Sequence, residues 1–202
     1  NHQYSVIQRA LFLEDEWRMA EAFALTGGIR FDHHEKYGNH YSPRAYGVWY
    51  VDDQWTIKGG VARAFKAPEI RAVIKDYAVL RRNTWAMLGN PNLKPETSTN
   101  YELSAMWTDR EKLSGSATVF YNDFRDKLST LTTDKLWNGY IVMERINVDR
   151  AVIKGLELTA SWKITHERAL KANYIRINSE QKSGSNRGAA LALTPKHKAN
   201  IR

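Results

Sequence analysis

Alternation with a period of two runs through most of the chain and restricts what it can fold into. From Trp55 to Phe65 the odd positions are mostly large and apolar, whereas the even positions are small or polar. Such alternation is typical of β-strands with two different faces. The pattern predicts an all-β fold with about nine strands, near residues 3–18, 22–33, 42–52, 54–65, 98–109, 113–127, 146–163, 168–180 and 194–202.

The connections between these strands alternate in length. Short polar turns are predicted at 19–21, 52–54, 109–112 and 165–167, and long connections at 34–41, 66–97, 128–145 and 181–193. A rim of tight turns opposite a rim of long loops is typical of antiparallel transmembrane β-barrels. Soluble sandwiches also use hairpins, but strands this long are unusual in them.

The two faces of the predicted strands suit a barrel with a wet lumen. Large side chains would face lipid, small and polar ones would face the lumen, and aromatic residues near the tight turns would form an interfacial girdle. The lipid-facing set is Phe23, Leu25, Ile29, Phe31, Trp55, Ile57, Val61 and Phe65; the lumen set is Thr26, Gly28, Arg30, Asp32, Thr56, Lys58 and Gly60; the girdle is Trp17, Phe23, Trp55, Trp107 and Trp162.

A soluble all-β module is the alternative. It would bury Leu25, Ile57, Val119 and Leu158, and its net charge of +8 would serve nucleic acid or glycan binding. The chain has no cysteine, so disulfides and thiolate metal sites do not arise. It has no apolar run near the roughly 20 residues of a membrane helix, and no nucleophile elbow, phosphate loop or zinc-protease motif, so we do not expect an enzyme.

Three stretches carry motifs. The first is Gly59-Gly60-Val61-Ala62-Arg63-Ala64-Phe65-Lys66-Ala67-Pro68. The second is Gly89-Asn90-Pro91-Asn92-Leu93-Lys94-Pro95-Glu96-Thr97-Ser98, followed by Tyr101-Glu102-Leu103. The third is Phe120-Tyr121-Asn122-Asp123-Phe124-Arg125-Asp126, followed by Ile146-Asn147-Val148 and by Ile153-Lys154-Gly155-Leu156-Glu157-Leu158. Together they resemble the motifs of the TonB-dependent receptors of bacterial outer membranes, with Ser104 where that family usually has glycine. The prolines of these motifs remove backbone donors and predict a rigid entrance to and exit from the 66–97 loop.

The resemblance implies an outer-membrane receptor and transporter for a ferric siderophore, energised by TonB, and it is nearest to catecholate-siderophore and colicin receptors. Family members have a plug domain and a barrel of about 22 strands. Residues 1–202 would then be part of the C-terminal barrel domain, with the plug and the terminal strands absent. Implied partners are the ferric siderophore, TonB through the plug, lipopolysaccharide, and a colicin or phage; no nucleic acid and no cofactor is implied. A receptor for heme or vitamin B12 remains an alternative.

The long 66–97 connection is where a ligand site is expected. Ferric catecholates are bulky aromatic anions, which guanidinium groups and aromatic faces suit. The cluster 81–85 is the strongest candidate, and the loop could instead meet anionic lipopolysaccharide. The predicted ligand-binding residues are Arg71, Lys75, Tyr77, Arg81, Arg82 and Trp85.

The 33–40 connection carries His33, His34, Glu35 and His40, which could imitate a metal site. Their spacing matches no closed structural metal motif, so no metal site is predicted there. Tyr37 or Tyr41 could touch a ligand instead.

Overall fold

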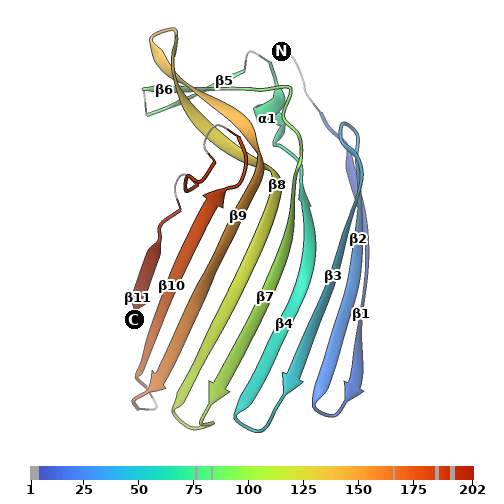
Figure 1. Ribbon diagram of the computed structural model, residues 1–202, viewed down its shortest axis with the longest axis vertical. Coiled ribbons are helices and arrows are strands. Elements are labelled where there is room, and N and C mark those ends of the chain that lie inside the picture. The colour runs from blue at the N-terminus through green and yellow to red at the C-terminus, as the bar shows by residue number, and fades with distance from the viewer. Residues whose placement is uncertain (1–4, 76, 83, 166, 185–186, 192–193) are drawn as a thin grey trace.

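The protein, described here by a computed structural model over residues 5–75, 77–82, 84–165, 167–184, 187–191 and 194–202, is one curved sheet of antiparallel long strands. Figure 1 shows the strands lying side by side in chain order, with tight turns at the lower rim. The long strands are β1 (Gln8–Ala20), β2 (Phe23–His34), β3 (Gly38–Tyr50), β4 (Trp55–Lys66), β7 (Glu96–Thr108), β8 (Leu113–Trp137), β9 (Tyr140–Lys163), β10 (Ala169–Gln181) and β11 (His197–Ile201).

All nine predicted strands are present in the predicted order. The 66–97 connection contains three short elements: α1 (Ile70–Val73), β5 (Ala78–Arg81) and β6 (Trp85–Leu88). Parts of some predicted segments lie outside the described residues, namely residues 3–4, 76, 83, 166, 185–186 and 192–193. Within the described residues no helix is long and apolar enough to cross a membrane.

Two predicted long connections are wrong. The 34–41 connection is a three-residue turn, because β2 continues to His34 and β3 already begins at Gly38, where φ is +74°. The 128–145 connection is mostly strand, because β8 and β9 continue as one hairpin to a turn at Asn138 and Gly139. Those two residues have φ of +48° and +84°, which is the backbone that an Asn-Gly hairpin turn requires.

The strand register confirms the two faces. Residues directly opposite each other in neighbouring strands point to the same side of the sheet. One row runs through Ile57, Ala105, Ala117 and Leu158, and the next row along the opposite face runs through Lys58, Ser104, Thr118 and Glu157. The first face is apolar and the second is polar over four adjoining strands.

In the part of the chain that the structure describes, nothing covers the apolar face. Val119 is 50% exposed and Leu158 is 40% exposed, although both are large hydrophobic side chains. The buried apolar cluster of the described residues is small and lies near the loop rim, at Val148, Ala151 and Leu191. A soluble module would bury Val119 and Leu158, so that alternative is wrong for this fold.

The aromatic girdle lies where it was predicted. Phe23 and Trp55 are the first residues of β2 and β4, and Trp107 and Trp162 lie one residue before the ends of β7 and β9. Trp55 and Trp107 are direct cross-strand partners. The girdle therefore follows the rim of tight turns, as expected for an interface with lipid headgroups.

The polar face is lined by hydroxyl groups that bond across strands. The Thr118 hydroxyl donates to Ser104 Oγ at 2.9 Å, and the hydroxyls of Ser116 and Thr159 lie 2.7 Å apart. A hollow of about 600 Å³ follows this face near the tight turns and is lined mainly by small polar side chains such as Thr56, Ser114 and Ser161. Such a surface suits contact with water or a polar neighbour.

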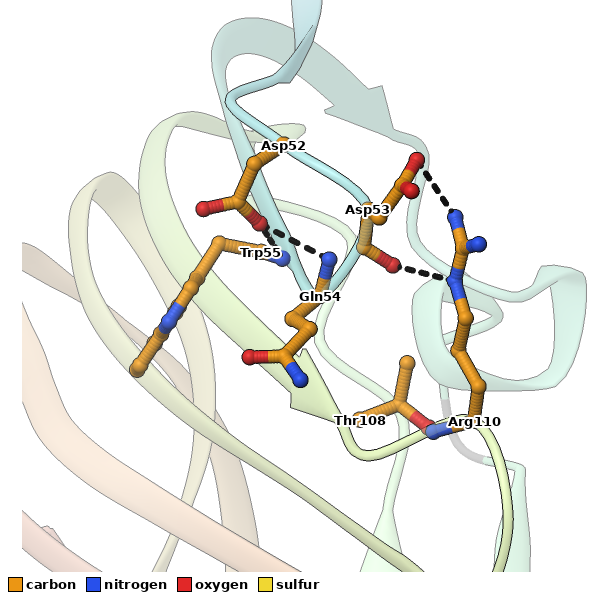
Figure 2. A network of polar contacts seen from close by, with 6 residues as sticks. All are labelled: Asp52, Asp53, Gln54, Trp55, Thr108 and Arg110. Carbon is orange, nitrogen blue, oxygen red and sulfur yellow. Dashed lines mark hydrogen bonds and ion pairs between the residues drawn. The ribbon is translucent and has the colours of Figure 1, made fainter.

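The tight turns are held by carboxylates that accept backbone amides. Asp52 Oδ1 accepts the amides of Gln54 and Trp55, each at 2.7 Å. Arg110 then joins two neighbouring turns, since its Nε donates to the Asp53 carbonyl at 2.6 Å and its guanidinium pairs with the Asp53 carboxylate at 2.7 Å (Figure 2). These contacts hold the β3–β4 turn next to the β7–β8 turn.

Candidate functional site

The 66–97 connection folds back onto the extended β8–β9 hairpin. β5 and β6 form an antiparallel hairpin, and β6 pairs in parallel with β9 from Trp85–Ile141 to Leu88–Glu144. The amide of Ile141 also donates to the carbonyl of Thr84 at 3.0 Å. Figure 1 shows the β5–β6 hairpin crossing the upper part of the β8–β9 hairpin. The loop is thus held by backbone pairing.

Three of the six predicted ligand-binding residues lie at the tip of the β5–β6 hairpin. Arg81 is directly opposite Trp85 in the register. Arg82 follows in the turn with φ of +48°, and both arginines are exposed, whereas Trp85 is half-buried. Asn83, within the predicted 81–85 cluster, lies outside the described residues. The structure therefore places two guanidinium groups and an indole at one tip.

The other three predicted residues lie at the base of the hairpin. Arg71 is in α1, Lys75 follows it, and the carbonyl of Tyr77 accepts the Gly89 amide at 3.0 Å where the hairpin begins. Four strand residues separate the base from the tip, a length of about 13 Å. The predicted set is divided into two groups, and sequence reasoning did not foresee this division.

The cations of both groups are open to solvent. Arg71, Lys75, Arg81 and Arg82 are exposed. None of the four forms an ion pair with a described acidic residue. We call these four residues with Tyr77 and Trp85 the basic rim. Residue types of this kind suit an anionic ligand with flat rings.

The segment Asn90–Glu96 fixes the base of the loop to β8 and β9. Asn147 on β9 is central: its Oδ1 accepts the Lys94 amide at 2.9 Å, and its Nδ2 donates to the carbonyls of Lys94 at 2.9 Å and Asp126 at 2.7 Å. Asn90 Nδ2 donates to the Arg145 carbonyl at 2.9 Å, and Leu93 is buried. We call this set of contacts the clasp.

The far end of the clasp closes on β8. Glu96 Oε2 accepts the amide of Leu128 at 2.8 Å and lies 3.7 Å from Lys127 Nζ. At the near end the Asn90 amide donates to the carbonyl of Ala72 at 2.7 Å. The family motif at 90–96 thus has a structural role, and the basic rim is positioned by it.

Replacing Asn147 with alanine is expected to loosen the clasp. Three hydrogen bonds to backbone groups would be lost. The two to Lys94 are exposed, whereas the one to the Asp126 carbonyl is partly buried, and leaving such a buried group unsatisfied costs about 1–3 kcal/mol. Limited proteolysis of the full receptor should then cut the 66–97 segment faster. Asn178→Ala is the control, since Asn178 is exposed and its side chain forms no hydrogen bond with the described residues. Equal cleavage of the two variants would contradict a structural role for Asn147.

The β2–β3 turn supports the clasp from the other side. Lys36 Nζ donates to the Pro91 carbonyl at 3.1 Å, and the Tyr37 hydroxyl donates to the Leu93 carbonyl at 3.1 Å. His34 Nδ1 accepts the amides of Lys36 and Tyr37 at 3.2 and 3.3 Å. Burial raises the pKa of the Tyr37 phenol and lowers the pKa of the His34 imidazole below its ordinary value of 6.5.

The histidines of this turn have other partners than a metal. His33 Nδ1 lies 2.7 Å from Asn39 Oδ1, and the His40 ring stacks on Phe65 with centroids 3.7 Å apart. No three His, Asp or Glu side chains converge on one point in the described part of the chain. Tyr37 is occupied by the clasp, and Tyr41 is exposed beside Phe31.

Acid is expected to loosen the β2–β3 turn. Because the folded state holds the pKa of His34 below 6.5, its stabilising contribution is present above pH 6.5 and is lost as pH falls below that value. Hydrogen exchange at the amides of Lys36 and Tyr37, corrected for intrinsic rates, should accelerate between pH 7.5 and 5.5. His34→Phe should abolish this response, whereas His33→Gln should keep it. The same response in both variants would rule out His34 as the cause.

The tip of the β8–β9 hairpin is a part of the candidate site that sequence reasoning missed. Leu136, which is 70% exposed, and Trp137 precede the turn at Asn138. Lys135 pairs with Glu144 across the hairpin at 2.9 Å. The Asn138-Gly139 pair is a strong hairpin signal that could have revealed this extension. The parallel contact with β6 has no such local signal.

Comparisons with known proteins agree with this fold. The family model described as TonB dependent receptor-like, beta-barrel, matches residues 1–202. The iron-regulated outer membrane virulence protein of Vibrio cholerae serotype O1 is 44% identical over 201 residues, which are 96% of this chain and 30% of that protein. The ferrienterobactin receptor of Escherichia coli K12 is 30% identical over 95% of this chain and 26% of its own length.

A solved structure gives the same result. A crystal structure of a variant of the ferric enterobactin receptor PfeA from Pseudomonas aeruginosa superposes with a TM-score of 0.74 at 28% identity, covering 96% of this chain and 29% of that chain. The chain thus spans less than a third of the length of these relatives. It belongs to the TonB-dependent receptor-like β-barrel family and forms a sector of an outer-membrane barrel.

Proposed function

We propose that the receptor to which this chain belongs binds a ferric siderophore of the catecholate class at the basic rim and imports it with energy from TonB. The observation that carries this proposal is the β5–β6 hairpin tip. There Arg81 and Arg82 are exposed without a described acidic partner, next to the indole of Trp85. This combination suits a ligand that is both anionic and aromatic.

The rigid support of the rim also favours a binding role. Backbone pairing of β6 with β9 and the clasp at Asn147 hold the rim before any ligand arrives. A preorganised site loses less conformational entropy on binding, which favours high affinity. The names of the relatives, an iron-regulated outer membrane protein and two enterobactin receptors, support the same ligand class.

Transport would require parts outside this chain. In the proposed receptor a plug domain fills the lumen and passes the pull of TonB to the ligand. The hydroxyl-lined polar face, with Thr118 and Ser104 bonded across strands, is the surface such a plug would meet. A polar surface of this kind can exchange hydrogen bonds with a moving neighbour without exposing apolar area.

Uptake of a radioactive metal tests the proposal, with radioactive iron in the siderophores and heme and radioactive cobalt in cobalamin. The full-length gene is expressed in a bacterial strain that has an outer membrane but no siderophore receptors of its own, and cells are given ferric enterobactin, a ferric hydroxamate, heme or cobalamin. We expect accumulation from the ferric catecholate that disappears in a strain without TonB. Accumulation from heme or cobalamin alone, or uptake that does not depend on TonB, would overturn it.

A further inference from the structure

The apolar face of the sheet becomes mixed at a defined height, where cations and other polar side chains join it. The register gives six successive rows across β4, β7, β8 and β9 on this face. The lowest begins with Trp55 and Trp107, and the fourth contains Val61, Tyr101, Tyr121 and Lys154. The fifth row contains Arg63, Thr99, Asp123 and Val152, and the sixth contains Phe65, Thr97, Arg125 and Arg150. Of the two apolar members, Val152 is buried and Phe65 stacks on His40.

The distance from the tight-turn tryptophans to these cations matches the thickness of a membrane's hydrocarbon core. Trp55 to Arg63 is a span of nine strand residues, and a tilted strand needs about 9–11 residues to cross the hydrocarbon core. Tyr101 and Tyr121, with ring centroids 6.3 Å apart, form the upper aromatic pair opposite the tryptophans of the tight-turn rim. In outer-membrane barrels the long loops face the outside of the cell, so Arg63, Arg125 and Arg150 would lie at the headgroup level of the outer leaflet, on the face away from the lumen.

Two of these arginines are direct cross-strand partners. Arg125 on β8 pairs in register with Arg150 on β9, and both are exposed. Like charges directly opposite each other on a sheet face are destabilising. Asp123 offsets only part of this repulsion, because its carboxylate binds the Arg150 guanidinium at 2.8 and 3.1 Å. A further anion would relieve the remaining repulsion.

The surrounding charges leave the cluster positive. Arg63, Arg125 and Lys154 form no ion pair with described acidic residues. The next carboxylate on this face, Glu180, is paired with Lys182 at 2.6 Å. Arginine binds phosphate oxygens with two parallel hydrogen bonds, and basic residues near a membrane surface attract anionic headgroups.

We propose that Arg63, Arg125 and Arg150, with Lys154 below them, bind the phosphate groups of lipopolysaccharide in the outer leaflet. The site lies on the lipid-facing side directly above an apolar surface that acyl chains would cover, so a phosphate attached to a lipid fits both parts. A siderophore approaching the lumen would not reach this face. The inference depends on the family and the register, and it is independent of which ligand the receptor imports.

Lipid binding to the purified full-length receptor tests the site. The triple variant Arg63→Gln, Arg125→Gln and Arg150→Gln is compared with a charge-matched triple variant at the tight-turn rim, Lys112→Gln, Lys163→Gln and Arg168→Gln. Native mass spectrometry then measures the binding of bisphosphorylated lipid A and of dephosphorylated lipid A. A variant is folded if its unheated barrel migrates on a gel as the wild-type barrel does. If the triple variant is not folded, the single variant Arg63→Gln replaces it in the comparison.

We expect wild type and the tight-turn control variant to prefer bisphosphorylated lipid A. The triple variant at Arg63, Arg125 and Arg150 should bind this lipid at least about tenfold more weakly than wild type. Arg63→Gln alone should weaken it by a smaller factor. Equal binding by all folded proteins, or no preference of wild type for the phosphorylated lipid, would overturn the proposal. Full displacement of the lipid by inorganic phosphate alone would also overturn it, because the site would then hold free phosphate.

Discussion

Replacing Gly155 with alanine is expected to destabilise the assembled barrel by about 1–3 kcal/mol or more. A Cβ atom at this position would lie 2.3 Å from the backbone oxygen of Arg176 on β10 and 2.6 Å from the Phe120 ring. The ring can turn away, but the Arg176 oxygen is fixed in the β9–β10 ladder, where the register runs without a break from Ala169 to Gln181. The added methyl group must therefore distort the sheet.

Gly47→Ala is the matched control for this substitution. The nearest atoms to a Cβ at Gly47 are carbons of the Phe23 ring at 3.4 Å, which is ordinary contact. Since glycine weakens a strand relative to alanine by about 0.5–1 kcal/mol, Gly47→Ala should be neutral or stabilising. The measurement is the urea midpoint of the full receptor in detergent micelles. Equal midpoints for the two variants would mean that the close approach at Gly155 is unimportant.

Replacing the three side chains at the tip of the β5–β6 hairpin is expected to weaken the proposed receptor's affinity for its ferric catecholate about 100-fold. The variant Arg81→Gln, Arg82→Gln and Trp85→Ala deletes two exposed guanidinium groups and the indole beside them. Charge-assisted hydrogen bonds and stacking would both be lost. The measurement is equilibrium binding to the purified full receptor. Because the variant lacks two positive charges, its affinity should depend less on salt concentration than that of wild type.

Two further variants separate binding from support of the loop. Lys112→Gln with Arg168→Gln removes the same number of charges at the opposite rim and should leave affinity unchanged. Trp85→Phe keeps the strand pairing with Ile141 and an aromatic face, so it should retain most of the affinity. If the tip variant binds the ferric catecholate as tightly as wild type, the basic rim is not the ligand site.

The strands and their faces could be predicted because their signals are local. Alternation at residues such as Trp55, Ile57 and Val61 follows directly from the geometry of a strand, and it does not depend on distant contacts. The face of the sheet that points to lipid could also be predicted, because lipid on one side and water on the other require different residue types. Val119 and Leu158 confirm it.

The arrangement of the loops could not be predicted in the same way. The parallel pairing of β6 with β9 joins Trp85 to Ile141, and the clasp joins Lys94 to Asn147. Such long-range contacts leave no periodic pattern in the sequence. The residue types of the basic rim were predictable, whereas the separation of Arg81 and Trp85 from Arg71 and Lys75 depends on the short β5–β6 hairpin.

The β8–β9 extension is a different case, because its signal was present. The Asn138-Gly139 pair lies between two runs of strand-forming residues and is typical of a two-residue hairpin turn. Interpreting 128–145 as a loop ignored this signal. The turn residues adopt the positive φ values that such a turn requires.

Equilibrium binding of a ligand panel to the purified full-length receptor tests the central claim most directly. Quenching of tryptophan fluorescence is followed during titration with ferric enterobactin, a ferric hydroxamate, heme and cobalamin. We predict the highest affinity for ferric enterobactin, and a loss of that preference when Arg81, Arg82 and Trp85 are replaced. A wild-type receptor that binds heme or cobalamin more tightly than the ferric catecholate would contradict the proposed function.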